Sequence, residues 1–496
     1  MTAMADSCIQ RWTIALVLIY CMSFVGCKRY TAAVVEYEPF YTDKIFHSKE
    51  EAFQKALLIN LREFAKWTKL AAQRGANIIV FPENGLFGFL NRDLVKPYLQ
   101  HLPEPTKIGN QYEIPCAQAN IEKFNDGPVL QFLSCLAARY EIAIVANVGE
   151  VQPCNRMLDN DCPPDKQFQY NTNIVLDTDG SFIAKYRKEH LFFEPEYDQP
   201  ATCENIAFTP SFGVTFGIMT CFDILYNCPA VTLINKYHIK NFVIPMAWMK
   251  GIPLLQSNQY QQAWSRSHGV NVIAANVHFL RADMTGSGIY SSGLVKAWYY
   301  NNNSSRNGSQ LLVAELDSED SQPQTSLCRK ARAVALEPPP SHSKGQTFQS
   351  LMMHNIYNFV LLDKTKQGQA SVCFGTLCCH LQFERDQTSE IFALAAYDGP
   401  YYVFKNFHLQ VCALVKCNSN EDKRKCGQPV YQSQTIFKSL TISGTFSNKT
   451  VLYPTSLLDG IRLVQPQLTH FDPKLKVLTE CPLNNPLISA ALIGRL

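Results

Sequence analysis

Residues 216–226 read FGIMTCFDILY, and the interpretation of the whole chain starts from this stretch. The apolar run from Phe212 to Met219 is typical of a buried strand, which stops at Thr220 and presents Cys221 where the chain turns. In α/β proteins such strand ends commonly carry reactive groups. Free cysteine is also a common small core residue, and taken alone Cys221 is better explained that way. The remainder of the chain reverses this preference.

Strands and helices alternate through the first 300 residues. Thr31–Tyr37 is predicted as a strand, and the capping-box spacing at 48–51 opens a helix that ends at Gly75. Asn77–Phe81 is a continuous apolar run, typical of a strand covered on both faces. Further strands are predicted at 142–147, 173–176, 181–186, 241–245 and 270–277, with helices at 128–140, 229–237 and 256–268. This order predicts an α/β fold whose sheet is covered by helices.

The pattern changes after residue 317. Residues 318–346 include Pro338-Pro339-Pro340 and are predicted as a linker. From 347 to 496, short alternating runs predict a β-rich second domain. We therefore expect a signal peptide at 1–27, a first domain at 28–317, this linker, and the second domain at 347–496. The cysteines of the second domain match no zinc spacing, so disulfides are expected there and no metal site: Cys373, Cys378, Cys379, Cys412, Cys417 and Cys426.

Composition limits the class of protein. The 496 residues are 46% hydrophobic and 18% charged, which is a globular composition, and the net charge is only +3. No basic stripe with interleaved aromatic residues is present, so nucleic acid is not expected as a partner.

The N-terminus predicts export. Arg11 precedes the apolar stretch Trp12–Gly26, which is short for a membrane span and typical of a secretory signal, with an uncleaved anchor as the alternative. No other segment is expected to span a membrane, and Pro486–Leu496 lacks the form of a lipid-anchor signal. We therefore expect a secreted, extracellular protein. Glycosylation sequons agree with this expectation; they begin at Asn302, Asn303, Asn307 and Asn448.

The cysteine count fits export and one unpaired thiol. The chain has 18 cysteines, and cleavage after Cys27 would leave 15, an odd number. Cleavage before Cys27 would change this parity.

Three polar residues follow apolar strands. Glu83 follows 77–81, Lys188 follows 181–186, and Cys221 follows 212–219. The carboxyl ends of neighbouring parallel strands meet at one edge of a sheet, so a carboxylate, an amine and a thiol are expected to converge there. Taken alone, Glu83 could simply stabilise a turn, and Lys188 could be a solvated surface charge. The presence of all three residues at strand ends favours a catalytic site.

The three side chains supply one mechanism. A thiol attacks an amide efficiently only when a base removes its proton, a role that Glu83 can fill. Lys188 and the backbone N–H of Phe222 can stabilise the oxyanion of the tetrahedral intermediate. Glu83 then protonates the leaving amine and activates the water that cleaves the thioester.

Several phrases resemble a known family. VFPENG around Glu83, YRKEHLFFE around Lys188 and TCFDI around Cys221 resemble the Glu, Lys and Cys motifs of the nitrilase (carbon-nitrogen hydrolase) superfamily, in its order. Longer phrases resemble its vanin and biotinidase branch, among them FQYNTNIV (168–175), PMAWM (245–249) and MTGSGIY (284–290). The likeness covers about 31–300 and resumes in phrases such as QVCALVKC (410–417) up to the final IGRL.

The resemblance implies a nitrilase-type four-layer α-β-β-α sandwich domain with a β-rich base domain docked on it, and no metal or organic cofactor. Vanins hydrolyse pantetheine to pantothenate and cysteamine, and biotinidase releases biotin from biocytin. The family's pairs suggest the disulfides Cys116–Cys135 and Cys154–Cys162. Cys203 and Cys228 flank the nucleophile strand, and they either pair with each other or are unrelated thiols. No partner is assigned to Cys328 or Cys481.

Four more residues are candidates. Glu194 follows Lys188 by six residues, where nitrilases often carry a second supporting glutamate. Tyr170 and Trp248 are candidate residues of the substrate cleft, with ordinary core packing as the alternative. Asp223 is expected to orient local backbone.

The sequence therefore predicts a secreted amidohydrolase that acts on a small-molecule amide through a cysteine thioester, with pantetheine as the expected substrate. Biotinidase-like hydrolysis of biocytin is one alternative. An extracellular binding protein that keeps the fold without activity is the other. The sequence does not reveal the oligomeric state.

Overall fold

A computed structural model describes residues 28–40, 49–305, 308–319, 347–402, 404–419 and 421–495, without the side chains of 49–53 and 404–406. The predicted signal peptide lies outside these residues, as do the predicted linker from residue 320 onward and the sequon at Asn307.

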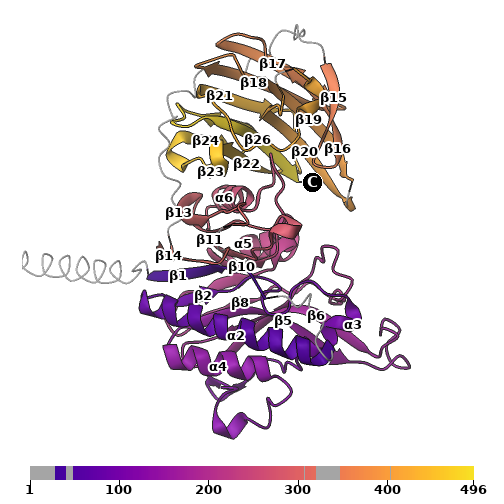
Figure 1. Cartoon of the computed structure of the whole chain (residues 1–496), viewed down its shortest axis with the longest axis vertical. Coiled ribbons are helices and arrows are strands. Elements are labelled where there is room, and N and C mark those ends of the chain that lie inside the picture. Colours follow the sequence, from indigo (N-terminus) through magenta and orange to yellow (C-terminus); the bar gives the residue numbers. More distant parts are fainter. Residues whose placement is uncertain are drawn as a thin grey trace, which may run out of the picture.

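Two six-stranded sheets form the first half of the molecule (Figure 1). The first has the order β14 (Gln310–Asp317), β1 (Arg29–Glu36), β2 (Ile78–Val80), β5 (Ala143–Pro153), β6 (Gln167–Leu176) and β7 (Phe182–Arg187). The second has the order β13 (Leu294–Tyr299), β12 (Ser287–Ser291), β11 (Asn271–Asn276), β10 (Asn241–Met246), β9 (Phe216–Ile218) and β8 (Ala207–Phe208). The central strands β1, β2 and β5 are parallel, as are β9, β10 and β11.

The sheets face each other across one core. Val34, Val80 and Val145 of the first sheet pack against Ile218 and Val243 of the second, and all are fully buried. Helices cover the two outer faces because the strands are apolar on both sides. The helices α2 (Lys49–Gln73) and α4 (Pro128–Tyr140) pack on the first sheet, and α5 (Thr232–Tyr237) and α6 (Ser257–His268) on the second. The predicted four-layer α-β-β-α sandwich is confirmed.

The second half is a β-sandwich that lies against α6 (Figure 1). Its seven-stranded sheet has the order β15 (Thr347–Met352), β16 (Asn355–Leu361), β19 (Phe392–Tyr401), β20 (Phe404–Lys416), β26 (Leu487–Arg495), β22 (Val451–Leu458) and β23 (Arg462–Leu463). Its five-stranded sheet has the order β17 (Gln367–Phe374), β18 (Leu377–Arg385), β21 (Phe437–Gly444), β25 (Val477–Glu480) and β24 (Thr469–Asp472). The β-rich character predicted for this half is confirmed.

Two elements around the nucleophile differ from their predicted bounds. The strand predicted over 212–219 is only β9, because a turn with Gly213 at φ +78° precedes it. The helix predicted from Pro229 begins instead as a π-helical turn, Asn227–Val231, which runs into α5. At β9 apolar residues extend beyond both ends of the strand, so hydrophobicity alone misplaced its ends.

Candidate active site

Glu83, Lys188 and Cys221 converge at one end of the sandwich. Glu83 lies just beyond β2, Lys188 directly follows β7, and Cys221 begins a short 3₁₀ helix, η3 (Cys221–Leu225), after β9. Glu83 and Lys188 therefore come from the first sheet and Cys221 from the second. The sequence suggested one shared sheet edge, whereas the structure uses the adjacent edges of two stacked sheets.

An ion-pair cluster surrounds Lys188. Its Nζ atom donates to Glu83 Oε1 at 2.6 Å and also pairs with Glu194 Oε1. The amide nitrogen of Asn171 donates to both carboxylates, at 2.8 Å to Glu83 Oε1 and 2.7 Å to Glu194 Oε2. Glu83 and Lys188 are each only 1% exposed. The cluster thus holds two carboxylates, one ammonium and one amide in fixed positions.

One carboxylate oxygen of this cluster has no hydrogen-bond partner among the described residues. That oxygen, Oε2 of Glu83, is buried. A lysine ammonium has three donors, and two of those on Lys188 are used by the glutamates. The free carboxylate oxygen and the third donor are therefore available to a substrate.

Burial sets the protonation of the cluster. It raises the pKa of Glu83, while the nearby Lys188 ammonium opposes that rise. Burial alone would lower the pKa of Lys188, but Glu194 and Glu83 outweigh it and raise the pKa well above its ordinary value. Burial and the Glu83 charge raise the pKa of the Cys221 thiol well above its ordinary value. Cys221 therefore rests as a thiol and needs a base before it can attack.

The backbone around Cys221 is fixed by Thr220 and Asp223. These two residues form a capping box at the start of η3, and Cys221 itself has φ +45°, in the left-handed region. Asp223 also accepts hydrogen bonds from Tyr186 Oη at 2.7 Å and from the backbone N–H of His190 at 2.9 Å. Asp223 thus links the nucleophile turn to the segment that carries Lys188, and it orients backbone as the sequence suggested.

The other candidate residues differ in how close they lie to the catalytic cluster. Glu194 contacts Lys188 directly, whereas Phe222 lies in the first turn of η3. Trp248 lines a cavity beside Cys221, with its indole N–H donating to Leu255 O at 2.9 Å. Tyr170 lines neither of the two cavities described below; its ring lies 4.3 Å from the Arg187 guanidinium. Because side chains alternate along a strand, Tyr170 and its inward-facing neighbour Asn171 occupy opposite faces of β6.

Asn171 is the functional candidate that the sequence interpretation missed. It lies in the middle of β6, not at a strand end, so a search for polar residues beyond strands passes over it. The signal was the polar pattern QYNTN within a buried strand, since a buried amide needs partners.

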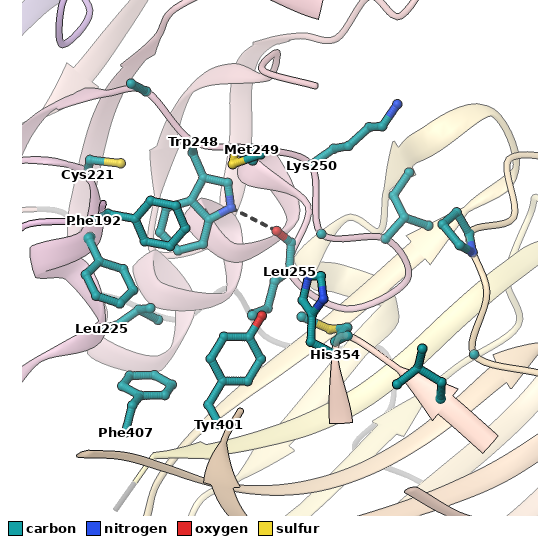
Figure 2. Close-up of a pocket in the computed structure, with 18 of the residues that line it drawn as sticks. Phe192, Cys221, Leu225, Trp248, Met249, Lys250, Leu255, His354, Tyr401 and Phe407 are labelled. Carbon is teal, nitrogen blue, oxygen red and sulfur yellow. Dashed lines mark hydrogen bonds between the residues drawn. The ribbon is translucent and has the colours of Figure 1, made fainter. Parts of the chain in front are cut away.

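Two cavities meet at Cys221. The first, the apolar cavity, has a volume of about 380 Å³ and is lined by η3, the 247–255 segment and the C-terminal sandwich, including Tyr401, Phe407 and His354 (Figure 2). The second, the acidic cavity, has a volume of about 420 Å³ and contains Glu83, Lys188, Glu194 and Glu196. Four residues line both: Phe192, Cys221, Ala247 and Met249.

The disulfides of the described residues do not include the nucleophile Cys221. Disulfides join Cys116 to Cys135, Cys154 to Cys162 and Cys203 to Cys228. In the C-terminal sandwich they join Cys373 to Cys378, Cys379 to Cys412 and Cys417 to Cys426, and Cys481 is also disulfide-bonded. Within the described ranges, Cys221 is the only free cysteine. This many disulfides is typical of proteins from oxidising compartments.

Comparison with known proteins identifies relatives along nearly the whole chain. The family profile "Carbon-nitrogen hydrolase" matches residues 31–268, and "Vanin C-terminal domain" matches 346–496. Pantetheinase of Mus musculus is 37% identical, over 86% of this chain and 80% of the relative. Pantetheinase of Homo sapiens is 35% identical, over 97% and 91%, and biotinidase of Rattus norvegicus is 34% identical, over 94% and 92%. The chain therefore belongs to the pantetheinase and biotinidase family of carbon-nitrogen hydrolases and is an amide hydrolase.

Proposed function

We propose that this enzyme hydrolyses pantetheine to pantothenate and cysteamine through a thioester on Cys221. The observation that carries the mechanism is the buried Glu83 carboxylate, which Lys188 and Asn171 hold through one oxygen, while Oε2 has no partner in the part of the chain that the structure describes. The pantetheinases that align with most of the chain support the choice of substrate.

Acylation uses the three residues in turn. Glu83 takes the thiol proton as Cys221 Sγ attacks the amide carbon, and the carbonyl electron pair moves to oxygen. Lys188 Nζ and the backbone N–H of Phe222 stabilise that oxyanion. When the intermediate collapses, the C–N bond breaks and Glu83 gives its proton to nitrogen, so that the amine leaves neutral.

Deacylation repeats the same proton transfer with water. Glu83 takes a proton from a water molecule, whose oxygen attacks the thioester carbon. The C–S bond then breaks, the acid is released, and the proton returns to Cys221. Glu194 takes no part in the bonds; it positions Lys188.

Biotin amides are the alternative substrates. Biotinidase of Rattus norvegicus aligns over 92% of its length, and the apolar cavity next to Cys221 can hold a ring as well as a chain.

The enzyme is proposed to act outside the cell on a small molecule. The predicted signal at 1–27 and the disulfides support export. Asn302, Asn303 and Asn448 are exposed, as glycosylation requires. No helix among the described residues has the length and hydrophobicity to cross a membrane. The domain bounds 28–317 and 347–496 are kept as part of this proposal.

The test is turnover of pantetheine and biocytin side by side, by secreted protein under mild reductant. We expect cysteamine release by the wild type and none by Cys221→Ala of unchanged melting temperature. Biotin release without cysteamine release would transfer the proposal to biotin amides. Turnover of neither substrate by folded protein with a free Cys221 would overturn both.

A further inference from the structure

Both cavities at Cys221 have mainly apolar walls, but only the acidic cavity has carboxylates in its lining. The apolar cavity is lined mainly by aromatic and aliphatic side chains, such as Phe222, Leu225 and Trp248. The acidic cavity carries the carboxylates of Glu83, Glu194 and Glu196 against one ammonium, that of Lys188. An amide bound at the nucleophile has two halves, the acyl group and the amine, and each must lie on one side of Sγ.

The proton transfer fixes which half lies where. Glu83 must come within about 3 Å of the leaving nitrogen to protonate it. Glu83 lines the acidic cavity and does not line the apolar cavity. The nitrogen, and with it the amine half, therefore belongs on the acidic side. The acyl group stays attached to Sγ and extends into the apolar cavity.

Charge favours the same arrangement. A released alkylamine takes up a proton in water near neutral pH, and an ammonium is stabilised beside carboxylates and destabilised in an apolar pocket. Glu196 lies at the acidic cavity, with only 3% of its surface exposed. Burial raises its pKa to about 7, so it is a carboxylate in part of the population near neutral pH and gains charge when a cation arrives.

The C-terminal sandwich supplies much of the wall on the acyl side. Tyr401 at the end of β19, Phe407 in β20 and His354 in the β15–β16 turn all line the apolar cavity. Lys250, which pairs with Asp283, lies across the cavity from Cys221 (Figure 2). An acyl group bound to Sγ in the apolar cavity therefore shares that cavity with residues of the second sandwich.

The geometry points to a divided substrate site, an inference that rests on the proposed function and extends it: the C-terminal sandwich selects the acid through Tyr401, and Glu196 selects the amine. The first sandwich then supplies the reaction, and the second supplies the discrimination between acids. Tyr401 and Glu196 are specificity residues that take no part in bond making.

The experiment is a matrix of four amides, made from pantothenic acid or biotin with 2-aminoethanethiol or 4-aminobenzoate. The second amine carries a carboxylate, which Glu196 should repel. The value of kcat/KM is measured for wild type, Tyr401→Ala and Glu196→Gln. Matched controls are Tyr402→Ala, whose side chain is 76% exposed beside Tyr401, and Glu122→Gln on the surface.

We expect Tyr401→Ala to change the ratio between the two acids by about tenfold or more, because pocket contacts of this size discriminate to that extent. The ratio between the two amines should stay within about twofold. Glu196→Gln should do the opposite, raising the relative rate of the aminobenzoate amides and leaving the acid ratio unchanged. The two controls should alter neither ratio.

The inference is overturned if Tyr401→Ala shifts the amine ratio, if Glu196→Gln shifts the acid ratio, or if neither variant shifts any ratio. Tyr401→Phe and the melting temperature show whether a loss in Tyr401→Ala reflects misfolding. If pantetheine is not the substrate, the result differs, because the wild type would then hydrolyse only the biotin amides. The division would still be tested in two ways. Glu196→Gln should change the ratio of kcat/KM between the two biotin amides, and Tyr401→Ala should lower kcat/KM equally for both.

Discussion

Lys188 Nζ lies 2.6 Å from Oε1 of Glu83, and the other oxygen of that carboxylate has no partner among the described residues. The ammonium therefore holds the carboxylate by one oxygen and leaves the other for proton transfer. Removing that oxygen as a base, in Glu83→Gln, should lower kcat/KM by about 10²–10⁴-fold. Folding should persist, since an amide fits the same space. A variant with normal stability and normal turnover would contradict the assignment of the base.

Replacing Asn171 should move the acid limb of the pH profile upward. Asn171 donates to Glu83 and lowers the pKa of that carboxyl against the rise caused by burial. In Asn171→Leu this donor is lost, so the pKa of Glu83 rises further. Activity needs ionised Glu83 and should therefore fall off at higher pH than in the wild type. The measurement is kcat/KM against pH, and an unmoved limb would refute the prediction.

Replacing Glu194 should move the same limb downward. The negative charge of Glu194 raises the pKa of Glu83, so Glu194→Gln lowers it and extends activity to lower pH. The variant also loosens Lys188, because the Glu194 carboxylate is its direct partner. We expect a smaller loss of kcat/KM than in Glu83→Gln. If the acid limb moves down in Glu194→Gln and up in Asn171→Leu, the two shifts reflect the pKa of Glu83 and not general damage to the site. Shifts of the limb in the same direction in both variants would contradict both predictions.

Glu480 should make stability depend on pH. It lies buried in β25, accepts hydrogen bonds from Ser456 and Thr469, and has its pKa raised by burial to about 7, although Arg266 of α6 opposes the rise. Between about 4.5, the value of an unfolded glutamate, and 7, the folded state binds a proton that the unfolded state does not. Stability should therefore fall as pH rises through this window, by on the order of 3 kcal/mol.

The measurement is the free energy of unfolding by urea at pH 5 and pH 8. Glu480→Gln removes the titrating group and should make the difference between these pH values smaller than in the wild type. An unchanged difference would mean that Glu480 is ionised throughout.

The disulfide beside the nucleophile should contribute to stability. Cys203 and Cys228 close a loop of 25 residues that contains Cys221. Replacing both by serine releases this loop in the unfolded state and should lower the free energy of unfolding by about 3 kcal/mol. Thermal unfolding of the double variant measures this, with Cys154→Ser/Cys162→Ser as a comparison, whose shorter loop of 8 residues should give a smaller loss.

The sequence was most informative where local pattern decides structure. Glu83, Lys188 and Cys221 could be found because each follows an apolar strand, and they converge in the structure. Asn171 could not be found by this route, because it lies within a strand and its role depends on which side chains oppose it. Tyr170, one residue earlier, was named as a candidate cleft residue with core packing as the alternative, and its ring packs on Arg187.

The packing between the two halves of the molecule could not be predicted from the sequence either. The helix α6 reads SNQYQQAWSRSH, a composition typical of a solvated helix, yet residues Ser257–Ser265 are all buried. One of their polar groups is bonded across the interface, where Gln262 Nε2 donates to Val464 O at 2.6 Å. Such partners lie some 200 residues away in the chain and leave no periodic signal.

The position of β26 has a consequence for biosynthesis. This strand lies inside the seven-stranded sheet, between β20 and β22, and Arg495 at its end donates to Leu225 O behind the nucleophile turn and lies 4.1 Å from the Phe407 ring. The sheet cannot close until residue 495 has left the ribosome. The wall of the apolar cavity is therefore completed after translation of the catalytic residues by hundreds of codons, and a nascent chain carries Glu83, Lys188 and Cys221 long before it has a finished substrate site.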